Sequence, residues 1–316
     1  MSHVVVTGGA GFIGSHLVDA LLAKNHSVTI IDDLSTGSEE NLVAASAARF
    51  IRASVLDERR LDEALEGANA VFHLAAIPSV LRSIRDPLRS HAVNATGTLM
   101  VLEACHRARI SRIVYAASSS AQGDLRNRPR SEWLAGRPRS PYAVAKYAGE
   151  LYGAIYHTIH GMEVVSLRYF NVYGPRQRLR GEYSNVIPAF LAAALRGRPA
   201  RIYGDGFQTR DFTYVSDVVR ASFLAMASLA APGNTINVGT GCPVTIRELA
   251  DLASRVLDCP IAIEHAPARP EDVYHMRADL ALARELLGFS PSTALEDGLR
   301  QTAAWMRGHL ADAEGP

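Results

Sequence analysis

Short apolar runs and longer amphipathic stretches alternate along the first half of the chain. The apolar runs are rich in β-branched residues and predict strands at 4–6, 27–32, 50–51, 70–74, 113–117 and 163–168. The stretches between them place apolar residues three or four apart and predict helices at 15–24, 38–48, 59–65, 89–107 and 142–159. Strands that alternate with helices predict a parallel sheet covered on both faces, which is an α/β doubly wound fold.

Elements become shorter after Asn171, and turn-forming Gly and Pro residues multiply. Two helices are still predicted there, at 245–257 and 280–287, and Thr245 with Glu248 has the spacing of a capping box. The change of rhythm predicts a second, smaller α/β domain that closes over the first. We expect the first domain to comprise 1–170 with 211–240, and a discontinuous substrate domain to comprise 171–210 and 241–316, whose last residues, 311–316, form a frayed tail.

The composition is that of an ordinary globular protein. Apolar residues make up 48% of the chain, which is enough to build an extensive core. A formal net charge of +1 argues against a general nucleic-acid-binding protein. The three cysteines, Cys105, Cys242 and Cys259, form no CxxC pair, which is typical of reduced thiols in a cytoplasmic protein, and no metal site is predicted. No apolar stretch approaches the roughly 18 residues that cross a bilayer. From the charge and from this length, neither nucleic acid nor a membrane is an expected partner.

Three glycines, Gly8, Gly11 and Gly14, lie directly between the first predicted strand and the first predicted helix. The first two allow a tight turn that approaches a pyrophosphate, and the third allows close packing of the helix against the strand. The helix then offers free N–H groups to the phosphates. The second strand ends in Asp32, whose carboxylate suits the adenine ribose hydroxyls and repels a 2′-phosphate. The pattern predicts a Rossmann domain with NAD as its cofactor, and the alternative is a tight turn without a ligand.

Tyr142 and Lys146 lie four residues apart in a predicted helix and therefore on one face of it. An ammonium group beside a phenol favours the phenolate, so we expect a lowered tyrosine pKa and a usable base near neutral pH. Ser118 begins a serine run at the end of a predicted strand, and its hydroxyl can polarise the same substrate oxygen. The alternative is a solvated Tyr–Lys pair and a polar strand end, but the two features together favour a catalytic centre.

Further motifs extend this pattern over nearly the whole chain. They are GGAGFIGS at 8–15, DDLSTG at 32–37, HLAA at 73–76, SSS at 118–120, YAVAK at 142–146, RYFNVYGP at 168–175, GDG at 204–206, RDF at 210–212, NVGTG at 237–241 and RPED at 269–272. Together they resemble the extended short-chain dehydrogenase/reductases, and more closely the nucleotide-sugar epimerase/dehydratase family, which includes the 4-epimerases of UDP-glucose and UDP-N-acetylglucosamine.

The resemblance implies that Ser118, Tyr142 and Lys146 oxidise the sugar at C4 while NAD takes the hydride. It implies NAD contacts from Gly8, Gly11, Phe12, Ile13, Gly14, Asp32, Asp33, Ser35, Thr36, Gly37, Val55, Leu74, Ala75, Ala76, Tyr142, Lys146 and Tyr169. It implies nucleotide-sugar contacts, with a UDP-sugar favoured, from Ser119, Ser120, Gln122, Asn171, Asn185, Val186, Tyr203, Arg210, Arg269, Asp272 and Met276. A homodimer is also implied, in which 89–107 and 142–159 pair with a second copy as a four-helix bundle.

Three positions depart from the family pattern. Gln122 stands where a tyrosine is usual, so a large aromatic ring beside the sugar has become a flexible amide. Ser54 replaces an aspartate that faces the adenine, which is expected to weaken adenine recognition. Met276 takes the place of a residue that limits sugar size, and its adaptable side chain could admit an N-acetyl group.

The serine run bears on the reaction. A 4,6-dehydratase of this family carries an acid and a base directly after its catalytic hydroxyl residue. Here those positions are Ser119 and Ser120, and a serine is neither an effective acid nor an effective base. A 4-epimerase needs no such pair, so 4-epimerisation of a UDP-hexose or UDP-N-acetylhexosamine is favoured. Gln122 keeps a second interpretation open, in which a hexosamine dehydratase eliminates the C6 hydroxyl and then returns the hydride. A dinucleotide-binding module without catalysis is the third.

Two basic clusters and one histidine lie outside these assignments. The cluster at 126–130 is expected to be a solvated loop. The cluster at 176–180 is either another surface loop or a mobile cover over the substrate. His73 ends a buried strand and is expected to be structural rather than catalytic.

Overall fold

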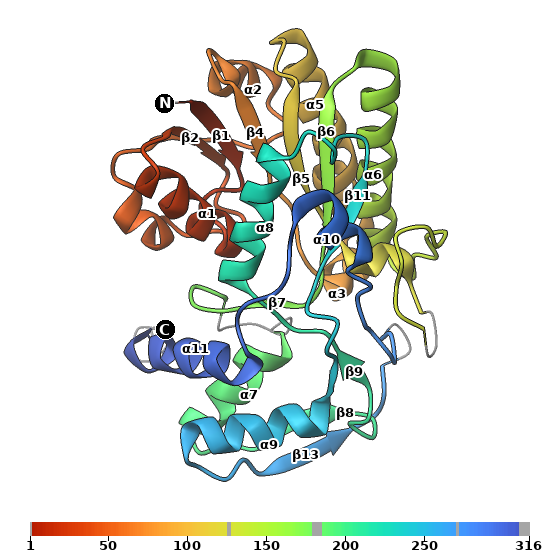
Figure 1. The fold of residues 1–316 in the computed structure, drawn as a ribbon. Coiled ribbons are helices and arrows are strands. Elements are labelled where there is room, and N and C mark those ends of the chain that lie inside the picture. Colours follow the sequence, from red (N-terminus) through yellow and green to blue (C-terminus); the bar gives the residue numbers. More distant parts are fainter. Residues whose placement is uncertain (1, 125–127, 179–184, 270–271, 310–316) are drawn as a thin grey trace.

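A seven-stranded parallel sheet forms the centre of the protein, with strand order β11-β6-β5-β4-β1-β2-β3 (Figure 1). The computed structural model describes residues 2–124, 128–178, 185–269 and 272–309. The strands of this sheet are β1 (His3–Thr7), β2 (Ser27–Asp32), β3 (Arg49–Arg52), β4 (Ala70–His73), β5 (Arg112–Ser118), β6 (Glu163–Tyr169) and β11 (Thr235–Val238). All neighbours pair in parallel, which confirms the predicted doubly wound fold.

Helices cover both faces of the sheet because alternate strand residues point to opposite sides. On β1, Val4 and Val6 pack into one apolar core while Val5 packs into the other. The first core is completed by α1 (Phe12–Ala23), α8 (Val215–Ala227) and α10 (Ala281–Leu287). The second is completed by α2 (Glu58–Leu65), α5 (Gly97–Arg107) and α6 (Pro141–His160). Burial on both faces explains why the strands read as nearly continuous apolar runs.

The helix predicted at 89–107 is helical throughout, but it is not a uniform α-helix. The structure has α3 (Val80–Arg85), α4 (Pro87–His91), a π-helical turn (Ala92–Thr96) and then α5. Asn94 lies in the π-helical turn and uses both ends of its amide on Ile77: its Oδ1 accepts from the backbone nitrogen at 2.9 Å and its Nδ2 donates to the carbonyl at 3.2 Å. A polar side chain thus fastens the chain that follows β4, and hydropathy carries no signal for such a contact. Similarly, the helix predicted at 38–48 is a shorter 3₁₀ helix (Glu39–Ala45), capped by Ser38.

A third apolar core lies in the lower part of Figure 1, where α7 (Val186–Leu195), α9 (Ile246–Leu257) and α11 (Leu295–His309) pack together. Three short two-stranded sheets accompany them: β7 (Val172–Tyr173) with β10 (Thr213–Tyr214), β8 (Ala200–Tyr203) with β13 (Ile263–Ala266), and β9 (Thr209–Arg210) with β12 (Val244–Thr245). The capping box of Thr245 and Glu248 at the start of α9 is confirmed.

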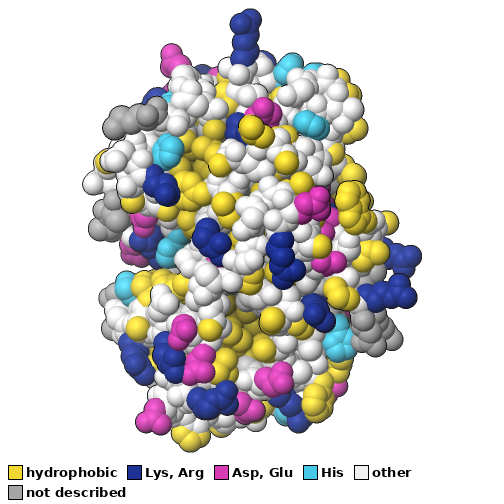
Figure 2. Space-filling view, viewed as in Figure 1, with side chains coloured by type: hydrophobic (Ala, Val, Ile, Leu, Met, Phe, Trp, Pro, Cys, Tyr) yellow, Lys and Arg dark blue, Asp and Glu magenta, His cyan; other side chains and the backbone are white. Residues whose placement is uncertain are grey.

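The residue boundaries of the two domains stay a prediction. Helix α10, which the sequence pattern assigns to the substrate domain, packs its Ala283 and Leu287 into the sheet core. Acidic and basic side chains are interspersed over the face shown in Figure 2, in keeping with a formal net charge of +1. None of the helices in the described part of the chain is long and apolar enough to cross a membrane.

Candidate active site

The glycine turn follows β1 at the carboxyl edge of the sheet, where the strand order reverses between β1 and β4. Ligands of doubly wound folds bind at such a point. Gly8 has a φ of +72°, and a Cβ added to it would lie 2.6 Å from the backbone nitrogen of Ala75. A Cβ on Gly14 would lie 2.8 Å from the Cα of Gly9. Gly11 precedes α1 and supplies no side chain to cap the first amides of the helix, so these groups remain open to a phosphate. The turn therefore fits the pyrophosphate of a dinucleotide.

Asp32 is buried at the end of β2 and holds the glycine turn from one side. Its Oδ2 accepts from the backbone nitrogen of Ala10 at 3.0 Å, and its Oδ1 accepts from that of Leu34 at 2.8 Å. Burial raises the pKa of this carboxyl, and the two backbone hydrogen bonds oppose the rise. Each carboxylate oxygen can accept a further bond, so ribose hydroxyls fit here. Asp33 is exposed and accepts from Ser35.

The other residues predicted to bind NAD lie near the glycine turn or in the apolar cores. A Cβ on Gly37 would lie 2.8 Å from the Ala10 carbonyl carbon, so this part of the loop packs on the glycine turn. Val55 and Tyr169 are buried in the apolar cores, and the Tyr169 hydroxyl bonds to Ser222 of α8 at 3.0 Å. Half-buried positions on the same edge are Phe12, Ile13, Thr36, Leu74, Ala75 and Ala76.

His73 ties the ends of β1 and β4 together. Its Nδ1 lies 2.7 Å from the Thr7 hydroxyl and its Nε2 lies 3.0 Å from the Thr98 hydroxyl. Burial lowers the pKa of His73 to about 3, so the ring is neutral and cannot exchange protons near neutral pH. Thr7 also accepts from the backbone nitrogen of Ala75 at 3.2 Å. The contacts agree with the structural role expected for His73.

Ser118, Tyr142 and Lys146 come together where β5 ends and α6 begins. Ser118 is the last residue of β5, and its hydroxyl hydrogen-bonds with the Tyr142 phenol and lies 2.7 Å from the Ser120 hydroxyl. Lys146 is buried one turn along α6, and its Nζ donates to the carbonyl of Ala116 at 2.8 Å. Three groups that can bind or move a proton therefore meet at the carboxyl edge of the sheet.

The protonation expected for Tyr142 needs correction. Burial raises the pKa of its phenol, and the Ser118 hydrogen bond only partly opposes the rise. Burial also lowers the pKa of Lys146 to about 7, while Glu150 acts in the opposite direction. The lysine points to a backbone carbonyl, and desolvation by the surrounding protein outweighs any effect of its ammonium on the phenol. The sequence pattern indicated that Tyr142 and Lys146 share a helix face, but it could not indicate how deeply the two side chains are buried.

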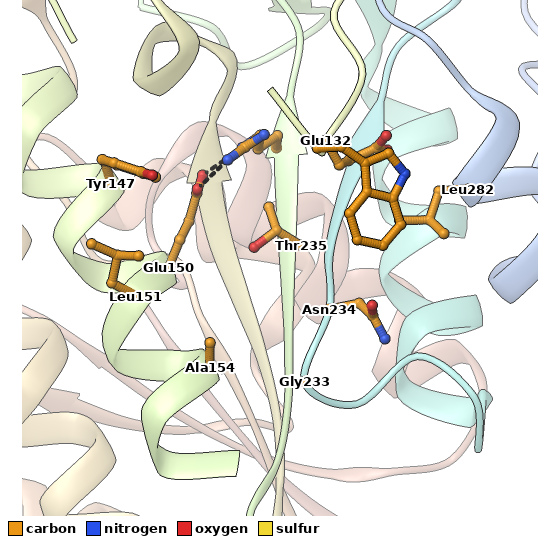
Figure 3. Close-up of a pocket in the computed structure, with 11 residues that line it drawn as sticks. Glu132, Tyr147, Glu150, Leu151, Ala154, Gly233, Asn234, Thr235 and Leu282 are labelled. Carbon is orange, nitrogen blue, oxygen red and sulfur yellow. Dashed lines mark hydrogen bonds and ion pairs between the residues drawn. The ribbon is translucent and has the colours of Figure 1, made fainter. Parts of the chain in front are cut away.

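A cavity of about 210 Å³ lies further along α6, between this helix and the β6–β11 edge of the sheet (Figure 3). Glu150 reaches into it and forms a buried two-point ion pair with Arg168 of β6, at 2.9 and 2.7 Å. Glu150 lies one helical turn after Lys146, so the cavity wall carries the carboxylate that supports the lysine charge. Its other lining residues are Glu132, Trp133, Tyr147, Leu151, Ala154, Gly233, Asn234, Thr235 and Leu282.

Met276 links several of the predicted sugar-binding residues. Its sulfur lies 3.6 Å from the Ser119 hydroxyl and 3.2 Å from the Asn171 amide nitrogen. Asn171 has a φ of +27°, a rare conformation for a residue other than glycine and one that clusters at functional sites. Gln122 is fully buried, and its Nε2 donates to the carbonyl of Ser131 at 2.7 Å. The amide that was expected to be flexible is therefore held by the protein.

Arg130 contradicts the expectation of a solvated loop at 126–130. Its side chain is fully buried, and its guanidinium donates to the carbonyls of Ser119 at 3.1 Å and His275 at 3.2 Å. Arg128 is exposed as expected, and 126–127 lie outside the described residues. A run of arginines and prolines has the composition of a surface loop, so no signal in the sequence distinguished Arg130 from its neighbours.

A second pocket, of about 160 Å³, gathers three of the residues predicted to bind the nucleotide. Tyr203, Arg269 and Asp272 line it, and the Arg269 guanidinium lies 3.6 Å from the centre of the Tyr203 ring. Gln208 also lines it and was missed: its Nε2 donates to the carbonyl of Tyr203, while its buried Oε1 has no partner among the residues that the structure describes. Pro270 and Glu271 of the RPED motif lie outside the described residues.

Arg210 lies beside this pocket on β9. It donates to the carbonyl of Thr209 at 2.9 Å, and burial lowers the pKa of its guanidinium although Asp272 opposes the fall. Asn185 is exposed before the first turn of α7 and makes no capping bond with its side chain, and Val186 begins that helix. A cationic side chain and an uncapped helix start are both suited to phosphate oxygens.

The cluster at 176–180 is only partly described. Arg176 forms an ion pair with Asp19 of α1 at 2.7 Å, and the neighbouring carbonyl of Pro175 lies 3.0 Å from the Nε2 of His16. These contacts tie the start of the cluster to the helix of the glycine turn. Residues 179–180 lie outside the described residues, and a cover over the substrate stays a prediction.

Comparison with known proteins assigns the chain to a family. Residues 4–239 match the model of the NAD dependent epimerase/dehydratase family. A UDP-glucose 4-epimerase of Mycolicibacterium smegmatis is 40% identical over 308 residues, which cover 96% of this chain and 98% of that protein.

Two solved structures are also similar over almost their full length. A UDP-N-acetylglucosamine 4-epimerase from Methanobrevibacter ruminantium M1, in complex with UDP-N-acetylmuramic acid, has a TM-score of 0.93 and 39% identity, with 98% of this chain and 99% of that chain covered. A Thermus thermophilus UDP-glucose 4-epimerase, in complex with NAD, has a TM-score of 0.90 and 36% identity, with 97% and 99% covered. These similarities confirm the resemblance seen in the motifs and, with it, an enzyme that uses NAD.

Proposed function

Because the chain belongs to the NAD-dependent epimerase/dehydratase family, we propose that it inverts C4 of a UDP-hexose or UDP-N-acetylhexosamine through transient oxidation at C4. The observation that carries the proposal is the meeting of Ser118, Tyr142 and Lys146 beside a serine turn that holds no acid or base. Oxidation and reduction at one carbon need a single proton-moving centre, which this site supplies. Elimination would need a further acid and base next to it.

The residues of the centre divide the proton chemistry between them. NAD, when bound, supplies the hydride acceptor and later the hydride donor. Tyr142 takes the proton from the C4 hydroxyl, and Ser118, hydrogen-bonded to that phenol, holds the same substrate oxygen. Tyr142 must be a phenolate to take that proton. The positive charge that Lys146 carries while it is protonated favours this form, against the burial that raises the phenol pKa. After the 4-keto sugar turns its other face, Tyr142 returns the proton.

The nucleotide pocket supports a UDP-sugar as the substrate. Tyr203 offers an aromatic ring, one face of which Arg269 covers. Gln208 offers a buried carbonyl oxygen that has no partner among the described residues, and Arg269 offers a cation for the diphosphate. A pyrimidine base has both a ring face and polar edges, so it matches this lining. Met276 borders the sugar side with a flexible thioether, which leaves an N-acetyl group acceptable.

The hexosamine dehydratase interpretation rests on Gln122, and the contacts of this residue do not favour it. Its Nε2 is committed to Ser131, and an amide is neither an acid nor a base in any case. Epimerisation therefore remains the function that the site supports better.

We also propose that the protein pairs with a second copy through α6. This helix exposes apolar side chains at three- and four-residue spacing on one face, and a contiguous apolar stripe on a helix is typical of an interface. The stripe comprises Val144 (50% exposed), Leu151 (52%), Tyr152 (37%), Ile155 (51%) and Ile159 (67%).

One experiment tests the reaction directly. The protein is incubated with UDP-N-acetylglucosamine in deuterated water, and the product is examined by NMR. Inverted C4 without deuterium at C5 is the expected result. Deuterium at C5 or a new alkene signal would show elimination instead, and no turnover with any UDP- or dTDP-sugar would overturn both reactions.

A further inference from the structure

Arg130 is a buried cation outside the catalytic centre and outside the nucleotide pocket. Its side chain is fully buried, although arginine is almost never found in that state unless it is paired. Among the described residues it forms no ion pair, and its Nε has no hydrogen-bond partner. Burial lowers the pKa of the guanidinium to about 10, and Arg210 adds to the fall while Asp124 opposes it. Holding such a charge in the interior costs free energy, so the contacts it makes there need an explanation.

Those contacts join two segments that are far apart in sequence. The guanidinium donates to the carbonyl of Ser119, directly after the catalytic Ser118, and to the carbonyl of His275, directly before Met276. A planar guanidinium has its donors in a fixed fork, so the two bonds set the spacing and the angle between the two carbonyls. Arg130 therefore works as a rigid bracket between the serine turn and the 275–277 segment.

The backbone of Arg130 is fastened as firmly as its side chain. Its nitrogen donates to the carbonyl of Arg277 at 2.9 Å, and its carbonyl accepts from the backbone nitrogen of Asp279 at 3.1 Å. The same carbonyl accepts from the side chain of Asn237, at the end of β11, at 2.7 Å. The bracket is thus attached both to the main sheet and to the segment that carries Met276.

Met276 is the residue placed by this bracket. Its sulfur lies against Ser119 and Asn171, and it is only 7% exposed. Ser119 meets both the sulfur and the guanidinium, so a shift of the bracket moves the wall of the sugar site and the neighbour of Ser118 together.

We propose that Arg130 is a positioning residue, which holds Met276 and the Ser118–Ser120 turn in register and thereby sets the choice between sugars with a C2 hydroxyl and a C2 N-acetyl group. This inference rests on the proposed function, since it assumes a hexose or hexosamine at the serine turn. Arg130 itself does not touch the substrate, because no part of its side chain is exposed.

The test compares Arg130→Met with Arg128→Met, which removes an exposed arginine from the same loop. Arg130→Met is expected to lower kcat/KM for UDP-N-acetylglucosamine about tenfold or more, and to change its ratio to kcat/KM for UDP-glucose about threefold or more. NAD affinity is expected to stay within about twofold, because the bracket lies away from the glycine turn. Arg128→Met is expected to leave all three quantities unchanged.

A double-mutant cycle with Met276→Leu separates positioning from a general loss of structure. If Arg130 acts through Met276, its effect on the selectivity ratio is largely lost when Met276 is already replaced, so the two changes are not additive. Arg130→Lys keeps the charge but lacks the fork, and it is expected to restore stability more than selectivity. Should Arg130→Met fail to fold, Arg130→Lys and its cycle with Met276→Leu decide the matter.

Two results would overturn the inference: an unchanged selectivity ratio in a folded Arg130 variant, or fully additive effects in the cycle. Both results presuppose that the wild-type protein epimerises UDP-sugars. A wild-type protein without turnover would overturn the proposed function instead, so the two failures are distinguishable.

Discussion

The carboxylate of Glu150 accepts hydrogen bonds from both Nε and Nη2 of Arg168, at 2.9 and 2.7 Å, and both side chains are buried. The pair stands one helical turn from Lys146, whose charge it supports. A buried ion pair therefore lies next to the lysine of the candidate catalytic centre, on the side of α6 that faces the cavity of Figure 3.

Replacing Glu150 by Gln is expected to shift the pH profile of the reaction. Burial lowers the pKa of Lys146 to about 7, and loss of the Glu150 charge lets it fall further. Since protonated Lys146 is the form that favours the phenolate, activity is lost as pH rises through this pKa, and the loss moves to lower pH. The variant is also expected to lose about 3 kcal/mol of stability, because the buried Arg168 loses the carboxylate to which it is hydrogen-bonded. The pH dependence of kcat/KM and chemical unfolding measure the two effects, with Glu285→Gln as an exposed control.

Tyr142→Phe is expected to remove nearly all turnover, by about 100-fold to 10,000-fold in kcat, because the group that moves the C4 hydroxyl proton is gone. NAD binding should persist, since the glycine turn and Lys146 are untouched. Single-turnover kinetics and NAD titration check both statements, and Tyr147→Phe on the same helix serves as the control. Full activity in Tyr142→Phe would rule out the assigned base.

Asp32→Asn is expected to weaken NAD binding about tenfold, because an amide cannot accept ribose hydrogen bonds on both of its polar atoms. It also exchanges the acceptor that Ala10 or Leu34 now uses for a donor, which loosens the glycine turn. Calorimetric titration with NAD measures the loss. Asp33→Asn, at an exposed position, is expected to lose much less; equal losses would show that Asp32 has no special place in the site.

Arg269→Gln is expected to raise KM for a UDP-sugar about tenfold and to change kcat far less, because it removes a diphosphate contact present in the ground state as well as in the transition state. It also removes the stack of Arg269 on Tyr203. Steady-state kinetics measure the changes in KM and kcat separately. The matched control is Arg201→Gln, which replaces an exposed arginine on β8. An unchanged KM for Arg269→Gln would show that the diphosphate does not bind to Arg269.

Ile155→Glu is expected to yield a monomer, because it places a charge in the middle of the apolar stripe of α6. Light scattering after size-exclusion chromatography measures the mass at a fixed protein concentration. Leu229→Glu, at a position 88% exposed outside the stripe, should remain a dimer. A wild-type protein that is already monomeric would contradict the proposed pairing.

The sequence predicted the main fold because its signals are local. Runs such as Val4–Val6 and the glycines before α1 each report on one element, and parallel sheets follow from their alternation. The pairing of Ser118 with Tyr142 was also readable, since a strand end and a helix start carry both motifs. The family comparisons confirmed the cofactor that these motifs indicated.

What remained hidden depends on contacts between distant segments. Arg130 reads as a surface arginine until the carbonyls of Ser119 and His275 are placed beside it. Asn94 reaches Ile77 from the π-helical turn, and no periodicity reports such a bond. The direction of the Tyr142 pKa needed the depth of burial, which spacing along a helix does not contain.

The stretch from Asp272 to Met276 has a consequence for the size of the substrate. Asp272 lines the nucleotide pocket, and Met276, four residues further on, lies at the serine turn. Under the proposed function, one short piece of chain therefore contacts both the nucleotide and the sugar. Under that function we expect a sugar 1-phosphate, which lacks the base, to fill only the Met276 end of this stretch and to be a poor substrate.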